Sequence, residues 1–277
     1  MSAAAGLTRG SAGSDEEAPP RDFHRRWPTL KPPLRPDATV VTQVADLLTG
    51  IKGPVLLLGV TPELAAIERH MVAVDWSEKM IALAWPGDTA RRQAVRGDWK
   101  ALPLADDSMA AAMSDGALTM LRWPDEAAVM LSELARVLRP GGRAVIRCFA
   151  TPDVPETLAA LGEVAARGDV PFHEWRLRFN MAAARADGQV AITSARLFEH
   201  YDAALPDRMG KALTQGWPVE ALAEIDAYRG SAYIHCYPKR SELAALLAGA
   251  WPGSWRFAET AGYPGAAHCP LLVLDRA

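Results

Sequence analysis

The stretch VLLLGVTPELAAIERHMVAVDWS, residues 55–77, contains two short apolar runs with a helical segment between them. The runs at 55–59 and 71–75 show no polar alternation, which is typical of strands buried on both faces of a parallel sheet. Between them, Thr61 fits the N-cap of a helix and Pro62 its first position. A strand, a helix and a second parallel strand form a right-handed βαβ unit.

The same alternation continues on both sides of this stretch. Before it, Asp37 fits the N-cap of a helix that ends near Gly50, and after it Ser77 fits the N-cap of the next helix. We expect further strands and one more helix, at 93–96, 109–114 and 143–149, and at 125–138 respectively. Strands and helices alternating at this spacing predict an α/β fold with a doubly wound, mainly parallel sheet.

The composition argues against a nucleic-acid-binding or membrane-spanning protein. The chain has 277 residues, 30 Lys and Arg against 33 Asp and Glu, and a net charge of −3, which gives no electrostatic attraction for nucleic acid. The N-terminus lacks an apolar signal region, and no apolar run is long enough to cross a bilayer. The three cysteines form no CxxC pair and are expected to be reduced, buried thiols. We therefore expect a cytoplasmic protein with no nucleic-acid or membrane partner.

The carboxyl ends of parallel strands meet at one edge of a sheet, and ligands bind there. The first strand leads into the turn Gly59-Val60-Thr61, where a backbone without side chains can approach a ligand. The free N–H groups of the helix that follows could receive a carboxylate. We expect this turn to form part of a binding site.

Acidic and aromatic residues follow three other strands. Asp75 is placed to accept hydrogen bonds from two ribose hydroxyls, and Trp76 beside it offers a flat face for adenine. Asp98 could accept from an exocyclic amine, with Trp99 adjacent, and Asp115 lies near the place of a reacting group. For each aspartate the simpler alternative is a turn or a helix cap.

Four segments together resemble the motifs of class I S-adenosylmethionine-dependent methyltransferases, in their order and their spacing. They are residues 55–59, 74–77 with Met80, 97–98, and RVLRPGG at 136–142, the last being the most diagnostic. The resemblance covers roughly 55–149, with further support from 231 to the C-terminus. It implies a seven-stranded sheet whose last strand is antiparallel.

The resemblance also implies a cofactor, S-adenosyl-L-methionine, and roles for several residues. Gly59 to Thr61 would lie along its methionine part, and Asp75 would hold its ribose. Trp76 and Met80 would sandwich the adenine, and Asp98 would bind the adenine amine. The reaction would be in-line attack by an acceptor on the sulfonium methyl group, which needs mainly alignment of the two reactants.

The first motif departs from the family pattern at three positions. The acid that the family usually carries two residues before its first glycine is replaced by Leu57, and Thr61 and Glu63 replace two glycines. Glu63 could supply the missing negative charge from the other side of the loop, or it could repel the carboxylate of the cofactor. The sequence leaves both possibilities open.

The chain divides into five parts by pattern. We expect a disordered tail (1–21), an N-terminal arm and helix (22–50), a cofactor-binding Rossmann-like core (51–149), an inserted substrate cap (150–230) and a C-terminal completion of the core sheet (231–277). In the cap we expect helices at 156–167 and 175–185 and a strand at 190–198. After it we expect strands at 231–237, 255–260 and 270–274, and a helix at 241–247.

The cap should select the acceptor, and its aromatic, Arg and Met content suits a small or medium-sized organic molecule. Candidate substrate residues are Trp27 and Arg35 in the proline-stiffened, non-helical arm and His173 at the start of a basic cap helix. The bland alternatives are a structural arm and an ordinary core or surface histidine. No histidine lies at metal-ligand spacing, so we predict no metal site. The arginines of the basic helix, Arg176, Arg178 and Arg185, are expected on a solvated face.

Three alternatives to methyl transfer remain at this point. Leu57, Thr61 and Glu63 would suit a catalytically silent pseudo-methyltransferase that acts as a scaffold. Asp75 would also suit a nicotinamide-dependent dehydrogenase, although the GxGxxG run of that class is missing. The third alternative is a different use of the same cofactor, such as aminopropyl transfer. The attacking atom and the oligomeric state are not predicted.

Overall fold

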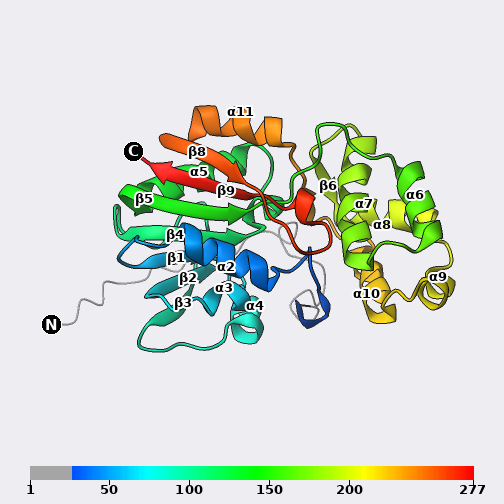
Figure 1. Cartoon of the computed structure of the whole chain (residues 1–277), viewed down its shortest axis with the longest axis horizontal. Helices are drawn as coiled ribbons and strands as arrows, with labels where there is room; N and C mark the ends of the chain where they lie inside the picture. The colour runs from blue at the N-terminus through cyan, green and yellow to red at the C-terminus, as the bar shows by residue number, and fades with distance from the viewer. Residues whose placement is uncertain (1–26) are drawn as a thin grey trace.

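A computed structural model describes residues 27–277 of the chain. The predicted tail at 1–21 lies outside these residues, and so does the beginning of the arm. The main sheet has seven strands in the order β3-β2-β1-β4-β5-β9-β8 (Figure 1). Their bounds are β3 Arg92–Arg96, β2 Met71–Asp75, β1 Val55–Leu58, β4 Met109–Asp115, β5 Leu138–Arg147, β9 Leu271–Arg276 and β8 Gly253–Ala258. All neighbours pair in parallel except β9, which is antiparallel to β5 and β8, so the predicted fold class is confirmed.

Helices cover both faces of the sheet because its strand residues are apolar in both directions. They are α2 (Ala38–Leu47), α3 (Pro62–Ala65), α4 (Glu78–Ala84), α5 (Asp125–Val137) and α11 (Arg240–Ala250). Leu57 packs in one core cluster with Val44 of α2, and Leu58 packs in the other with Leu134 of α5 and Leu243 of α11. Neighbouring strand residues therefore belong to opposite cores, as the period of two requires.

One predicted boundary of the main sheet is wrong. The sequence suggests that the turn at 140–142 comes before a strand starting at Arg143, but β5 begins at Leu138 and contains this turn. Leu138 pairs with Met109 and Arg143 pairs with Ala111, so the residues between them bulge out of the ladder. A glycine-rich turn inside a strand cannot be told from one that precedes it by periodicity alone.

The inserted segment forms a helical body at the end of the sheet toward which β5 points (Figure 1). Its elements are α6 (Leu158–Arg167), α7 (Phe172–Ala186), β6 (Ala191–Thr193), α8 (Ser194–Ala204), α9 (Arg208–Gln215), α10 (Val219–Ala223), η4 (Glu224–Tyr228) and β7 (Ile234–Cys236). Its helices pack around buried aromatic rings, among them stacked Trp175, Phe179 and Tyr201. From here on, the name cap refers to this body, residues 158–236, instead of the range 150–230 that the sequence predicted.

Two strand predictions in this region are wrong. The strand expected at 190–198 ends at Thr193, whose hydroxyl accepts the N–H of Arg196 at 3.2 Å and starts α8. Leu197 and Tyr201, four residues apart, then bury one face of that helix. The strand expected at 231–237 forms only β7, which pairs with β6 in a separate two-stranded sheet. This strand thus joins the cap rather than the main sheet.

The prediction of a solvated basic face on α7 is also wrong. The Arg176 side chain is only 5% exposed, and it donates to the Glu224 carboxylate at 2.9 Å and to the Tyr228 hydroxyl at 2.8 Å. Arg178 and Arg185 are 16% and 14% exposed and pair with glutamates of other segments. Buried arginines require such partners, since an unpaired buried charge is costly.

The arm joins the core to the cap. Contrary to the expectation of a stretch without helical structure, Trp27–Thr29 form a 3₁₀ turn, η2. The Thr29 hydroxyl donates to the Glu224 carboxylate of the cap. In the core, Arg147 at the end of β5 donates to the Pro33 carbonyl at 2.8 Å. The arm is thus attached on both sides of the edge where the strands end.

The cysteines agree with the prediction of buried thiols, since Cys148, Cys236 and Cys269 are all free and buried. Within residues 27–277, no helix combines the length and the apolar character needed to span a membrane. In the same residues, no group of three or more His, Cys, Asp and Glu side chains is arranged to hold a metal ion.

Candidate functional site

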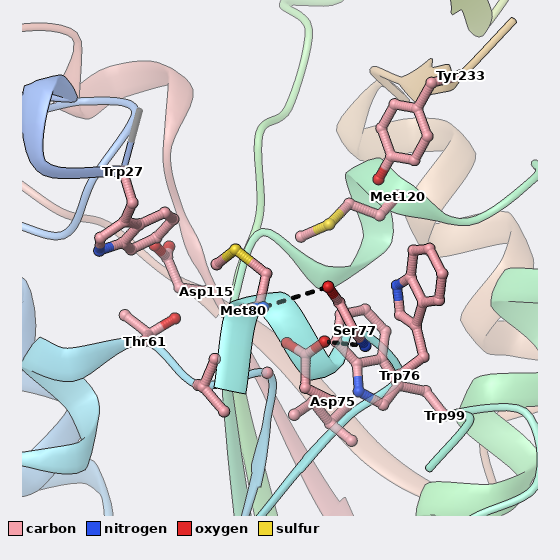
Figure 2. A pocket seen from close by; sticks show the side chains of 13 residues that line it. Trp27, Thr61, Asp75, Trp76, Ser77, Met80, Trp99, Asp115, Met120 and Tyr233 are labelled. Atoms are coloured by element: carbon pink, nitrogen blue, oxygen red, sulfur yellow. Dashed lines mark hydrogen bonds between the residues drawn. The ribbon is translucent and has the colours of Figure 1, made fainter. Parts of the chain in front are cut away.

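A cavity of about 590 Å³ lies at the carboxyl ends of β1, β2 and β4 (Figure 2). The core supplies most of its walls, the arm supplies one residue and the cap another. The described residues that line it are Trp27, Leu58, Gly59, Val60, Thr61, Asp75, Trp76, Ser77, Met80, Trp99, Asp115, Met120 and Tyr233.

The turn after β1 forms the floor of the cavity. Gly59 has φ +90°, a conformation that side-chain-bearing residues rarely adopt, and its N–H donates to the Val74 carbonyl at 2.8 Å. A Cβ at this position would stand 3.7 Å from Trp99. Thr61 lines the cavity but makes no side-chain cap, and α3 has only four residues. The helix thus begins with Thr61 at its N-cap position and Pro62 at its first position, as predicted, although it is short. Binding of a ligand carboxylate at this turn stays a prediction.

Asp75 is the last residue of β2, and its carboxyl group is buried in the cavity wall. It is 7% exposed, and one carboxylate oxygen accepts the Ser77 N–H at 2.8 Å. Burial raises the pKa of Asp75 from 3.8 to about 6, so the carboxylate is mostly ionised at neutral pH. The Ser77 hydroxyl in turn accepts the Met80 N–H at 3.2 Å and starts α4, which places Met80 at the cavity (Figure 2).

Asp115 ends β4 on the other side of β1. Its side chain is 4% exposed and forms an ion pair with Arg147, which is 1% exposed. Figure 2 shows Asp115 near Trp27 and Thr61, whereas Asp75 lies toward the opposite side of the cavity. The two carboxylates thus occupy separate regions of one site.

Aromatic rings and thioethers form the rest of the wall. Trp76 is 38% exposed, while Trp99 is 6% exposed and its indole N–H donates to the Val74 carbonyl at 2.7 Å. Met120 follows β4, and Tyr233 reaches the cavity from the chain just before β7 (Figure 2). Apolar faces beside a few polar groups suit a planar ligand with defined hydroxyls.

Three candidate residues lie outside the cavity lining. Asp98 is exposed and accepts the Lys100 N–H at 2.9 Å, so its contact with an adenine amine stays a prediction. Arg35 pairs with Glu63, and its guanidinium lies 5.4 Å from the centre of the Trp27 ring. Arg35 therefore contacts Trp27, a residue of the cavity lining, without lining the cavity itself.

His173 also lies outside this lining. It is 4% exposed, and burial lowers its pKa to about 4, so the ring is neutral at pH 7. Its Nε2 atom makes no hydrogen bond to any described residue. Its role in substrate binding stays a prediction, and the packing of its ring against Phe172 in the cap is what the structure shows.

Sequence reasoning missed four lining residues: Leu58, Ser77, Met120 and Tyr233. Leu58 and Ser77 adjoin predicted site residues and could have been included on that ground. Met120 follows Asp115 by five residues in a 3₁₀ turn, η3 (Ala117–Met120), which leaves no periodic signal. Tyr233 carries no sequence signal for this cavity, because its position depends on the folding of the whole cap.

Comparison with known proteins shows what the central part of the chain is similar to. The profile of a family described as a methyltransferase domain matches residues 58–146. Over 95 residues the chain is 42% identical to a demethylmenaquinone methyltransferase of Clavibacter sepedonicus, a match that covers 33% of this chain and 37% of that relative. The chain therefore matches little more than a third of the length of this relative.

Solved structures share the fold at low sequence identity. A SAM-dependent methyltransferase of Methanosarcina mazei has a TM-score of 0.51 and 14% identity, over 84% of this chain and 96% of that one. A protein of Rhodobacter sphaeroides described as a putative Zn-dependent alcohol dehydrogenase has a TM-score of 0.53 and 14% identity, over 92% and 94%. At such identity these similarities show the fold alone.

Proposed function

We propose that this chain, whose residues 58–146 match the profile of a methyltransferase domain, is a class I S-adenosylmethionine-dependent methyltransferase that transfers a methyl group from S-adenosyl-L-methionine to a small-molecule acceptor. The observation that carries the proposal is Asp75. It is a buried carboxylate at the end of β2, beside the Gly59 turn, in a cavity wall that also contains Trp76 and Trp99. A ribose with an attached adenine satisfies this combination.

The residues present fit the cofactor. Asp75 would accept hydrogen bonds from the two ribose hydroxyls, since only one of its oxygens is engaged by a backbone N–H. Trp76 and Met80 offer apolar faces for adenine, and the Gly59 turn leaves room for the chain that carries the sulfur. The bound cofactor supplies an already activated methyl group.

The protein contributes to the reaction mainly by aligning the cofactor and the acceptor. Trp27 from the arm, Met120 after β4 and Tyr233 from the cap surround the side of the cavity where an acceptor can approach. Holding the two reactants in line contributes most of the acceleration in such a displacement. A general base is needed only if the attacking atom arrives protonated.

The acceptor is proposed to be a small organic molecule, and the protein to act in the cytoplasm. The name of the Clavibacter relative specifies demethylmenaquinone, an organic molecule, as its acceptor, and the apolar rings and thioether at the acceptor side of this cavity suit an organic acceptor. The match to the methyltransferase-domain profile ends at residue 146, whereas the cap that would select the acceptor begins after it.

Calorimetric titration with S-adenosylmethionine, S-adenosylhomocysteine and NAD tests the proposed function. We expect the first two to bind in the micromolar range, about −8 kcal/mol, with no heat from NAD. Formation of S-adenosylhomocysteine in the presence of aromatic acceptors then tests turnover. Binding of NAD alone would restore the dehydrogenase alternative, and absence of all binding would favour the scaffold.

Gly59→Ala tests the role of the turn. We expect a loss of about 1–2 kcal/mol of stability from the positive φ and weaker S-adenosylhomocysteine binding, because the new Cβ faces the ligand beside Trp99. Gly50→Ala is the matched control, since Gly50 has φ +82° with open space around it. Thermal denaturation should show similar losses for both variants, and only the first should lose affinity. Equal affinities would place the ligand elsewhere.

A further inference from the structure

Two carboxylates line the cavity among the described residues, and they stand on either side of β1. Asp75 ends β2 and Asp115 ends β4, and both strands pair with β1. Neighbouring strands lie about 4.8 Å apart, so the two strand ends are separated by roughly 10 Å. One ligand that contacts both carboxylates must span this separation and carry hydrogen-bond donors or positive charge at both of its ends, as a nucleoside with a charged tail does.

No other acid near the first motif lines the cavity among the described residues. The position where the family usually has an acid holds Leu57, which is fully buried and belongs to the core cluster that contains Val44 and Met113. Glu63 has its charge paired with Arg35 and does not line the cavity. The structure shows Glu63 in an ion pair with Arg35, and the two possibilities that the sequence left open for its effect on the cofactor stay predictions.

Arg147 holds Asp115 in place and is not itself part of the cavity lining. Its Nε donates to Asp115, one terminal nitrogen donates to the Pro33 carbonyl at 2.8 Å, and the guanidinium lies 5.1 Å from the centre of the Phe149 ring. Desolvation by burial lowers the pKa of Arg147, but the charge of Asp115 and the hydrogen bond that Arg147 donates to it outweigh this and keep the pKa raised. Arg147 is therefore charged, and its guanidinium is paired with the Asp115 carboxylate at the cavity wall.

A buried ion pair contributes little net stability, because desolvation offsets the attraction. The pair of Arg147 and Asp115 is therefore better explained by a role of Asp115 in ligand binding than by a contribution to stability. We propose that Asp115, positioned by Arg147, binds the α-ammonium group of the methionine part of the cofactor, in place of the acid that Leu57 replaces. This inference rests on the proposed function and assigns a binding role to Asp115 and a positioning role to Arg147.

Three ligands separate the contributions of the amino-acid tail. S-adenosylhomocysteine has the ammonium and the carboxylate, its decarboxylated form keeps only the ammonium, and 5′-methylthioadenosine has neither. Asp115→Asn should weaken the first two by roughly 10- to 100-fold, the range of a charge-assisted hydrogen bond, and leave the affinity for 5′-methylthioadenosine unchanged. Calorimetry or ligand-induced thermal shifts measure all three affinities.

Asp115→Asn leaves the Arg147 charge buried and unpaired, which threatens folding. The double variant Asp115→Asn with Arg147→Met removes both charges and should show the same selective loss. Asp275→Asn is the matched control: Arg143, on the same strand, donates its Nε to Asp275 at 2.6 Å and a terminal nitrogen to the Leu47 carbonyl at 2.9 Å. This control should leave the ratio of the three affinities as in the wild type.

The inference is overturned if both Asp115 variants keep wild-type affinity for S-adenosylhomocysteine, or if they weaken all three ligands equally. A wild-type protein that binds none of the three ligands contradicts the proposed function itself. This result is visible before any variant is made, so the two failures are distinct.

Discussion

Arg176→Ala is expected to lower the free energy of unfolding by about 3–5 kcal/mol, the cost of breaking a buried ion pair by removing one partner. The Arg176 side chain is 5% exposed and its partner Glu224 is 6% exposed, so the remaining carboxylate would stay buried with less compensation. The Tyr228 hydroxyl would lose its hydrogen bond as well. Because Glu224 also binds Thr29, the loss should extend to the attachment of the arm.

Urea denaturation followed by far-ultraviolet circular dichroism measures this effect. The control is Arg196→Ala in the same cap, because Arg196 pairs with both Asp187 and Glu199 but is 48% exposed. Water replaces its partners, and we expect little change in stability. Similar losses for the two variants would mean that burial does not determine the importance of these pairs.

Asp75→Asn is expected to have opposite effects on binding and on stability. Burial raises the pKa of Asp75 to about 6, against 3.8 for a free side chain, so the folded protein disfavours the ionised form. Above pH 6 this penalty is fully present, and it disappears below 3.8, where the carboxyl is protonated in both states. The neutral amide should therefore stabilise the free protein at pH 7.5 by up to about 3 kcal/mol.

The same substitution should weaken S-adenosylhomocysteine and 5′-methylthioadenosine alike, by on the order of 100-fold, since both ligands carry the ribose hydroxyls that a carboxylate binds more strongly than an amide. Thermal denaturation of wild type and variant between pH 7.5 and 4 measures the stability difference, which should shrink as the pH falls. A variant that is less stable at pH 7.5 would show that the carboxylate is satisfied in the free protein.

The central sheet could be predicted because its signal is local. Strands such as β1 and β2 are buried on both faces and show as unbroken apolar runs, and their order follows from the family resemblance. The bulge in β5 could not be predicted, because Leu138 is an apolar residue that fits the end of α5 as well as the start of a strand. In the cap, α8 was missed because Thr193 acts as an N-cap within a sequence that also suits a strand.

The residues of the candidate site and of its surroundings also fall into two groups, those that the sequence could predict and those that it could not. Gly59, Asp75 and Asp115 follow predicted strands, and the topology alone brings strand ends together. Arg176 was assigned to solvent because its partner Glu224 is 48 residues away and no local pattern connects the two. Arg147 lies within a strand where the sequence shows only an arginine among apolar residues. Its partner is specified by the pairing register of β4 and β5.

The tryptophans of the cavity wall give the protein a built-in optical reporter. Three of its nine tryptophans, Trp27, Trp76 and Trp99, come from the arm, the end of β2 and the loop after β3 to surround one space. An adenine that stacks on an indole changes its emission, and a ligand that reached only the acceptor side would affect Trp27 first. Single replacements of these indoles by phenylalanine would therefore resolve, by fluorescence alone, which part of the cavity a molecule enters.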